Sequence, residues 1–93
     1  MVIGAARVEL HVHGSQSLKQ KRGVVRAISQ RVRNRFNVAV AEVGGQGTWQ
    51  HVVLGISTVS GDSQSARRRL EKTIDFIEDL HLAEVIDQEV EIL

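Results

Sequence analysis

The sequence predicts an α+β fold in which two helices cover one face of a four-stranded antiparallel sheet. Three observations predict it. Four stretches of the 93-residue chain alternate apolar and polar residues, two repeat apolar residues at helical spacing, and their order is strand, helix, strand, strand, helix, strand. Alternation with a period of two is typical of a strand with one buried side, whereas apolar residues three and four positions apart are typical of an amphipathic helix.

The first strand is predicted in MVIGAARVELHVHG, at 1–14. Its apolar residues share one face, which we expect to be buried: Val2, Ala6, Val8, Leu10 and Val12. Its polar residues share the other face, which we expect to be open: Arg7, Glu9, His11 and His13.

The first helix is predicted to begin after Ser17. Ser17 and Gln20 have the spacing of a capping box, in which the serine oxygen accepts a hydrogen bond from a first-turn N–H and the glutamine bonds back. The apolar residues of this helix fall on one arc at 100° per residue: Leu18, Val25, Ile28, Val32 and Phe36.

The middle of the chain predicts a hairpin. NVAVAEV at 37–43 is the second strand, and GGQGT at 44–48 is a tight turn, because glycine reaches backbone angles that other residues avoid. WQHVVLGISTVS at 49–60 is the third strand. One of its faces carries Val52, Leu54 and Ile56, and the other carries Trp49, His51 and Val53.

The last third of the chain predicts a helix and a strand. Asp62 or Ser63 can cap the helix, which buries Ala66, Leu70, Ile74, Ile77 and Leu80. The last strand, AEVIDQEVEIL, is expected to point Ile86, Val90 and Ile92 inward and Asp87, Glu89 and Glu91 outward.

This order of elements predicts a ferredoxin-like sandwich. Two right-handed crossovers and one hairpin give the strand order 4-1-3-2 with both helices on one face of the sheet. We expect a single domain over residues 1–93. A swapped or rearranged α+β dimer is the alternative.

The composition excludes several classes of protein. The chain has no cysteine, so disulfides, thiolate chemistry and cysteine-ligated zinc are excluded. No apolar run approaches the length of a membrane span, and the first residues do not have the layout of a signal peptide. We therefore expect a cytoplasmic bacterial protein that does not contact a membrane.

Spaced blocks of the sequence resemble one known family. SLKQKR at 17–22, FNVAVAEV at 36–43, WQ at 49–50, LGI at 54–56 and EVEIL at 89–93 are similar to the YlxP-like family of small uncharacterised bacterial proteins. The resemblance implies a ferredoxin-like fold. It also implies a gene that often lies beside genes of translation initiation and ribosome maturation, which favours a connection with RNA or the ribosome. It implies no activity and no catalytic residues.

Charge is segregated along the chain. Residues 1–69 hold eleven Lys and Arg against three acids, whereas residues 70–93 hold one lysine against eight acids. The stretch from 17 to 36 contains seven cations and no acid. Cations in the first turns of a helix oppose the helix dipole at a cost of roughly 0.3–1 kcal/mol each, so stability alone would not place them there.

These cations predict a phosphate-binding edge. We expect Lys19, Lys21, Arg22 and Arg26 to be its main contacts and Arg67, Arg68 and Arg69 to be a second arm. We also expect strands 1 and 3 to be parallel neighbours, so that both helix starts emerge at one edge with the hydroxyls of Ser15, Ser17, Ser63 and Ser65. The competing interpretation is an ordinary solvated surface.

The open face of the sheet predicts an interface. Trp49, His51 and Val53 share it with His11 and His13, but the aromatic pattern of sheet-face RNA readers is missing. A metal held by His11 and His13, with a third ligand from the third strand (His51) or from Glu89, is the alternative to plain polar exposure, but any alternating strand makes such pairs. We therefore expect no metal and no cofactor.

These observations favour a non-catalytic module that binds structured RNA or a ribosomal particle. The chain has no catalytic-triad spacing, no phosphate-binding loop and no dinucleotide fingerprint. An enzyme is therefore only the third interpretation. The runner-up is a homo-oligomeric module, such as a homodimer, assembled through the open sheet face.

Overall fold

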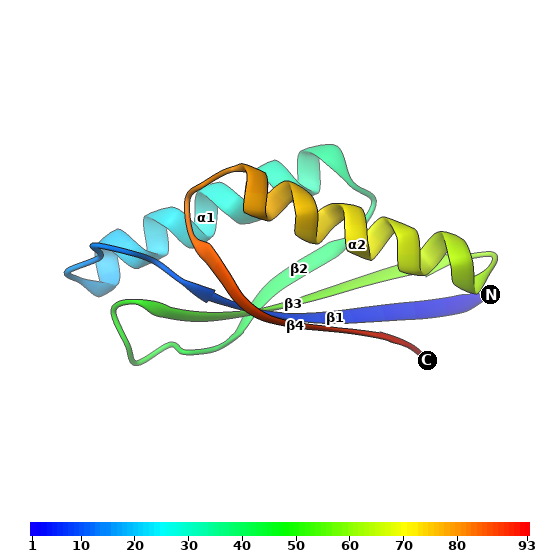
Figure 1. Cartoon of the computed structure of the whole chain (residues 1–93), viewed down its shortest axis with the longest axis horizontal. Coiled ribbons are helices and arrows are strands. Elements are labelled where there is room, and N and C mark those ends of the chain that lie inside the picture. The colour runs from blue at the N-terminus through cyan, green and yellow to red at the C-terminus, as the bar shows by residue number, and fades with distance from the viewer.

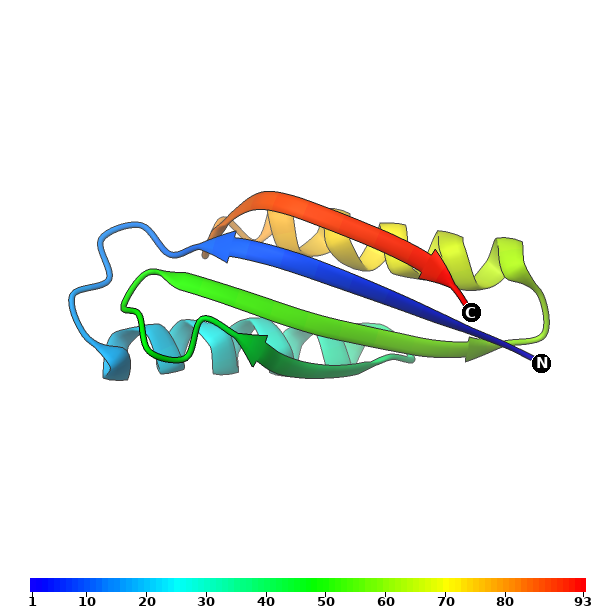
Figure 2. The ribbon, with the colours of Figure 1, turned by 90° about the horizontal axis from the view of Figure 1, so that it is seen from below.

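The computed structural model describes all residues from Met1 to Leu93. The chain forms β1 (Val2–His11), α1 (Leu18–Arg35), β2 (Ala39–Gly44), β3 (His51–Ser60), α2 (Ser63–Asp79) and β4 (Glu84–Ile92). The strands form one sheet in the order β2-β3-β1-β4, with antiparallel neighbours throughout. Both helices cover one face of this sheet and the other face is open (Figures 1 and 2). The predicted ferredoxin-like layout, with strand order 4-1-3-2, is confirmed.

The core lies between the sheet and the two helices. Figure 2 shows α1 behind the β2 side of the sheet and α2 behind β1 and β4. At Gly4 of β1, an added Cβ would lie 2.9 Å from a methyl carbon of Leu70, so α2 approaches the strand closely there. Thirteen buried apolar residues form the main cluster: Ala6, Val8, Leu10, Val12, Ile28, Val32, Val40, Val52, Leu54, Ile56, Leu70, Ile74 and Ile77.

Both helices begin with capping side chains. The Ser17 hydroxyl accepts a hydrogen bond from Gln20 N at 3.1 Å. The Gln20 side chain accepts from Gln16 N at 2.7 Å, one residue before the position that a strict capping box uses. Asp62, not Ser63, caps α2 by accepting from Ser65 N at 2.8 Å. The hydrogen bonds from the Ser65 backbone and hydroxyl hold the pKa of Asp62 below its ordinary value.

The two helix starts lie at opposite ends of the molecule, which corrects the predicted shared edge. β1 and β3 are antiparallel, with register pairs running from Val2 opposite Ser60 to His11 opposite His51. The helical crossover makes β2 run in the same direction as β1, and the hairpin then reverses the direction of β3. The helix that follows β3 therefore starts at the end where β1 begins (Figure 1).

A bulge in β4 corrects the predicted orientation of Ile86. The pairing with β1 shifts between Glu9 and Leu10, so that Val85 lies opposite Leu10 and Asp87 opposite Glu9. One extra residue in β4 turns Ile86 outward, where it is 48% exposed, and turns Val85 toward the core. Val90 and Ile92 keep the predicted phase, since both are partly buried.

The third strand begins two residues later than predicted. β3 starts at His51, and Trp49 lies in the turn between β2 and β3. Val53 is on the open face, as predicted, yet it is only 5% exposed. It packs closely against the backbone of Gly44 in the neighbouring strand, where an added Cβ would lie 3.2 Å from two carbons of Val53.

Candidate phosphate-binding surface

The exposed cations of α1 have no acidic partners. Residues Leu18–Arg35 include no Asp or Glu. The four ion pairs of the structure join Arg7 to Glu9, His13 to Glu84, Lys21 to Glu42 and His51 to Glu9. The exposed cations of the two helices therefore form no ion pairs. One of them, Arg33, donates a hydrogen bond to a backbone carbonyl oxygen and is described below. We call the following set the helix-layer cations: Lys19, Arg22, Arg26, Arg31 and Arg35 of α1, and Arg67, Arg68 and Lys72 of α2.

Lys21 is a buried structural residue, which removes it from the predicted phosphate contacts. The residue is 1% exposed. Its ammonium donates to the carbonyl oxygens of Gly45 at 2.5 Å and His51 at 3.2 Å, and it lies 3.7 Å from a carboxylate oxygen of Glu42. That oxygen has no hydrogen-bond partner and is buried. The ammonium therefore joins α1 to the base of the β2–β3 hairpin.

One side of α1 follows the β2 edge of the sheet. Arg22, Arg26 and Arg33 are spaced to share that side of the helix. The guanidinium of Arg33 donates to the carbonyl oxygen of Val40 in β2 at 2.9 Å, which shows where this side lies. Arg33 is therefore engaged, whereas Arg22 and Arg26 extend the same stripe with free side chains.

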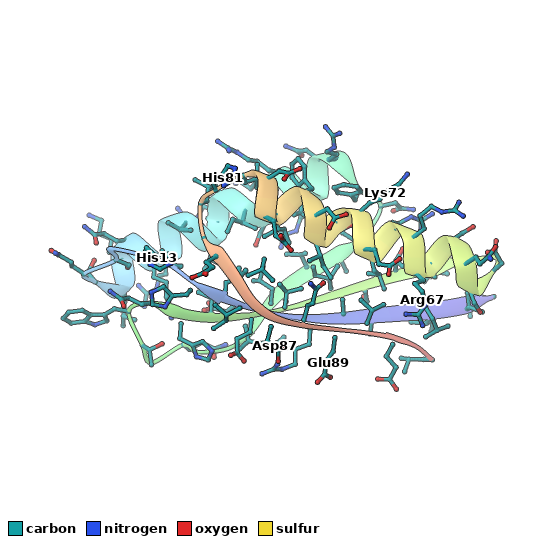
Figure 3. All side chains as sticks on the ribbon, viewed as in Figure 1. His13, Arg67, Lys72, His81, Asp87 and Glu89 are labelled. Carbon is teal, nitrogen blue, oxygen red and sulfur yellow. The ribbon has the colours of Figure 1, made fainter.

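The three arginines of α2 have different environments. Arg67 lies at the end of the molecule opposite His13 (Figure 3), and both Arg67 and Arg68 are exposed. Arg69 donates to the Thr58 hydroxyl at 2.6 Å and to a β3 backbone carbonyl at 3.0 Å. Arg69 therefore holds α2 onto the sheet, and only its two neighbours remain free to contact a ligand.

The start of α2 meets the end of α1, not its start. Arg68 and Lys72 line a shallow depression together with Phe36, and Arg35 lines the adjoining one. The Arg35 guanidinium lies 5.2 Å from the ring centre of Phe76, at a distance typical of a cation–π contact. The two depressions thus bring three cations together with two aromatic rings, and Asp75 and Asp79 line the second depression as well. The predicted shared edge had missed this grouping.

Acidic side chains occupy the opposite side of the molecule. Asp87 and Glu89 project from β4 on the face of the sheet away from the helices (Figure 3). Glu71, Asp75, Glu78 and Asp79 follow in α2 after its basic first turns. Charge is therefore segregated in space between α1, which has no acid, and β4, which has no cation, whereas α2 carries both signs.

The histidines pair with glutamates and with each other. His13 Nε2 lies 2.8 Å from a Glu84 oxygen, and His51 Nε2 lies 3.6 Å from a Glu9 oxygen. The rings of His11 and His13 are 4.3 Å apart in an edge-to-face arrangement. No three His, Asp or Glu side chains gather where they could hold a metal ion. Glu89 lies opposite Arg7 in the sheet, several residues from the histidines.

The predicted interface residues are not equivalent. Trp49 is 57% exposed in the turn and His51 is half-buried at the start of β3, whereas Val53 is buried. Of the three, only Trp49 offers a large apolar surface. A separate shallow depression on the sheet is lined mainly by small residues of β1, β2 and β3: Ala5, Ala6, Ala39, Val40, Ala41, Val43, Gly55, Ile56 and Ser57.

Neither helix is long and apolar enough to cross a bilayer.

Comparison with known proteins confirms the predicted resemblance. Residues 3–90 match the family model described as "Protein of unknown function (DUF503)". The chain is 39% identical over 77 residues to the "Uncharacterized protein YlxP" of Bacillus subtilis (strain 168), covering 83% of this chain and 84% of that protein.

The solved structures that are similar to this chain inform only the fold. The designed protein Foldit4 has a TM-score of 0.51 at 19% identity, and the match covers 99% of this chain and 94% of the design. A REP-associated tyrosine transposase bound to a REP hairpin reaches a TM-score of 0.44 at 17% identity, over 99% of this chain and 56% of that protein. The second likeness is too weak to carry an argument.

Proposed function

Because the chain belongs to DUF503, a family of unknown function, we infer its function from its surface. We propose that it binds structured RNA, free or within a ribosomal particle. The helix-layer cations contact the phosphate backbone. The protein acts as a binding module and not as an enzyme.

One observation carries this proposal: a helix of 18 residues includes no acid and exposes six cations, of which only Arg33 bonds to the protein. A solvated helix usually mixes charges, because like charges three or four residues apart repel each other by a few tenths of a kcal/mol. Glu42 of β2 is already paired with Lys21, and Asp75 and Asp79, which share a depression with Arg35, form no ion pair with it. The unpaired cations are therefore available to a polyanion.

The structure favours phosphate contacts over base reading. The free cations lie on the outer surface of two helices, and phosphate contacts carry little sequence information. The open sheet face lacks the central aromatic residues with which RNA readers of this fold stack bases. We therefore expect binding that depends on RNA shape and tolerates changes of sequence.

The test is a salt titration of binding to a structured RNA and to ribosomal particles. The variant Lys19→Gln/Arg22→Gln/Arg26→Gln removes three cations from the side of α1 that follows β2. If each contacts a phosphate, the log–log slope of affinity against salt becomes shallower by about 0.7–0.9 per residue. Equal slopes and equal affinities for wild type and variant would contradict the proposal.

A matched pair controls for the change in net charge. Arg22→Gln and Arg7→Gln each remove one cation, but Arg7 lies on the open sheet face, where it pairs with Glu9 at 3.1 Å. Binding should weaken for the first and stay close to wild type for the second. Circular dichroism spectra and melting curves check that every variant remains folded.

The open sheet face supports a second candidate, a homo-oligomer. Ile3 and Val59 are register partners at one end of this face, and both are exposed, as is Val43 of β2. Small side chains lie between them, so a second copy could pack closely on this face. Light scattering over a range of protein concentrations tests this candidate, and a monomer at every concentration would exclude it.

A further inference from the structure

The turn between β2 and β3 displays a side chain that the fold does not use. Trp49 is the one tryptophan of the chain, and it is 57% exposed. Tryptophan is usually well buried, because its large ring contributes strongly to a core or an interface. The indole contributes to no core cluster here and lines none of the depressions described above.

The turn is held in place from the α1 side. The Lys21 ammonium donates to the carbonyl oxygens of Gly45 and His51, which flank the turn. The Thr48 hydroxyl donates to the same two oxygens at 3.0 and 3.2 Å. Gly45 has a φ of +81°, and an added Cβ would collide with the His51 carbonyl, so the turn closes tightly at this point. Trp49 is therefore displayed on an ordered turn.

The turn is also bonded to the loop that precedes α1. Val12 N donates to the Gln50 carbonyl oxygen at 2.8 Å. The Gln50 side chain donates to the Ser15 carbonyl oxygen at 3.1 Å. Both neighbours of Trp49 in the sequence thus make hydrogen bonds that fix the backbone around it.

These contacts bring Trp49 to the end of the molecule where α1 begins. Figures 1 and 2 both show the β2–β3 turn and the start of α1 at that end. Lys21, which holds the turn, lies between Lys19 and Arg22 in the sequence, and both of those side chains are exposed and unpaired. Ser17 and Gln20 already bond to backbone N–H groups at the helix start, so an anion there would be bound by the cationic side chains.

We propose that Trp49 stacks on an unpaired base of the bound RNA while Lys19 and Arg22 contact the phosphates beside that base. The inference rests on the proposed function and deepens it, because it specifies RNA with an unpaired nucleotide in a loop, bulge or end. An exposed aromatic ring at the same end of the molecule as exposed cations suits such a nucleotide, whereas the bases of a uniform duplex are already stacked on one another. An aromatic ring can stack on any base, so this contact is consistent with binding that depends on the shape of the RNA and not on its sequence.

Trp49 fluorescence tests the inference directly, because all tryptophan emission comes from this residue. The probes are an RNA stem with an unpaired loop and a blunt RNA duplex with the same number of phosphates. We expect the stem-loop to quench the emission and to bind more tightly. The blunt duplex should bind through the cations with little change of emission.

Substitution provides the second measurement. Trp49→Ala should weaken binding of the stem-loop by about 5-fold to 150-fold, the range that corresponds to loss of one stacked base. Trp49→Phe should recover most of that loss, and neither change should alter binding of the duplex. Val59→Ala is the matched control, because Val59 is equally exposed at the other end of β3.

Each other outcome would overturn the inference. If the stem-loop binds without a change of emission, or if Trp49→Ala binds it as wild type does, Trp49 does not stack and the proposed function still stands. If neither RNA binds, both proposals fail together. If the emission changes with protein concentration in the absence of RNA, Trp49 belongs to a contact between copies of the chain.

Discussion

Lys21 of α1, which is buried, and Glu42 of β2, which is partly buried, form an ion pair with 3.7 Å between the ammonium nitrogen and a carboxylate oxygen. The pair lies between the helix layer and the sheet. It joins two residues that are 21 positions apart in the sequence, and the Lys21 ammonium anchors the turn that displays Trp49.

The two lysines of the first helical turns should therefore differ sharply in their effect on stability. Lys21→Met leaves one buried oxygen of Glu42 and two carbonyl oxygens without their cation, and we expect a loss of up to about 3 kcal/mol in the free energy of unfolding. Lys19→Met removes an exposed side chain and should change that free energy by no more than about 0.5 kcal/mol. Urea unfolding measures both, and equal effects would show that Lys21 is not the anchor.

The cap of α2 should make stability depend on pH. The folded-state pKa of Asp62 is lowered by its hydrogen bonds with Ser65, so the unfolded state takes up the proton more readily. The contribution of Asp62 is complete above the ordinary aspartate pKa of about 3.9 and is lost as the pH falls through the folded-state value. Asp62→Asn should melt at a lower temperature than wild type at neutral pH, and this difference should shrink in acid. A difference that is constant with pH would contradict the prediction.

The bulge in β4 predicts that two adjacent residues respond differently to truncation. Val85 faces the core, so Val85→Ala should reduce the free energy of unfolding by about 1–2 kcal/mol. Ile86 is turned outward, and Ile86→Ala should cost no more than about 0.5 kcal/mol despite removing more carbon atoms. Thermal and urea unfolding of the two variants check the order, which would be reversed if the strand had no bulge.

Two adjacent arginines of α2 should separate stability from binding. Arg69→Gln loses the hydrogen bonds to the Thr58 hydroxyl and the Val59 carbonyl, and we expect a loss of about 1–2 kcal/mol in stability. Arg68→Gln should leave stability within about 0.5 kcal/mol of wild type and weaken RNA binding. If Arg68→Gln has no effect on RNA binding while the α1 variants do, the depression beside Phe36 lies outside the binding surface.

The sequence predicted the fold well because each element carries its own period. The alternation in β1 and the helical spacing from Ile28 to Val32 describe faces that the structure does bury. The capping residues Ser17 and Asp62 also act as predicted, since a cap depends only on residues within one turn.

Features that depend on contacts between elements were harder to predict. Lys21 was counted with the surface cations, although its spacing to Ile28 and Val32 places it on the buried arc. Glu42 likewise lies on the inward face of its strand, with Val40. A cation on the apolar face of the helix and an acid on the apolar face of the strand were together the available signal for an ion pair between them.

The bulge and the helix starts show two further limits. A bulge adds one residue without leaving a pattern, because Val85 and Ile86 are both apolar and either could face the core. The positions of the two helix starts, in contrast, followed from the predicted topology alone. In an antiparallel sheet with a β2–β3 hairpin, β1 and β3 run in opposite directions, so the helices that follow them start at opposite ends.

The spatial segregation of charge also governs how the molecule meets a partner at a distance. The α1 side and the β4 side are separated across the shortest dimension of the body, 17 Å, which exceeds the Debye length of about 10 Å at 0.1 M salt. Each side therefore acts on a remote charge nearly by itself. The field of an approaching polyanion exerts a torque that rotates α1 toward it before contact, which shortens the orientational search and accelerates capture. If the protein binds RNA as proposed, the acids of β4 lie on the outward side, and we expect them to repel a second polyanion, so that one molecule contacts one RNA.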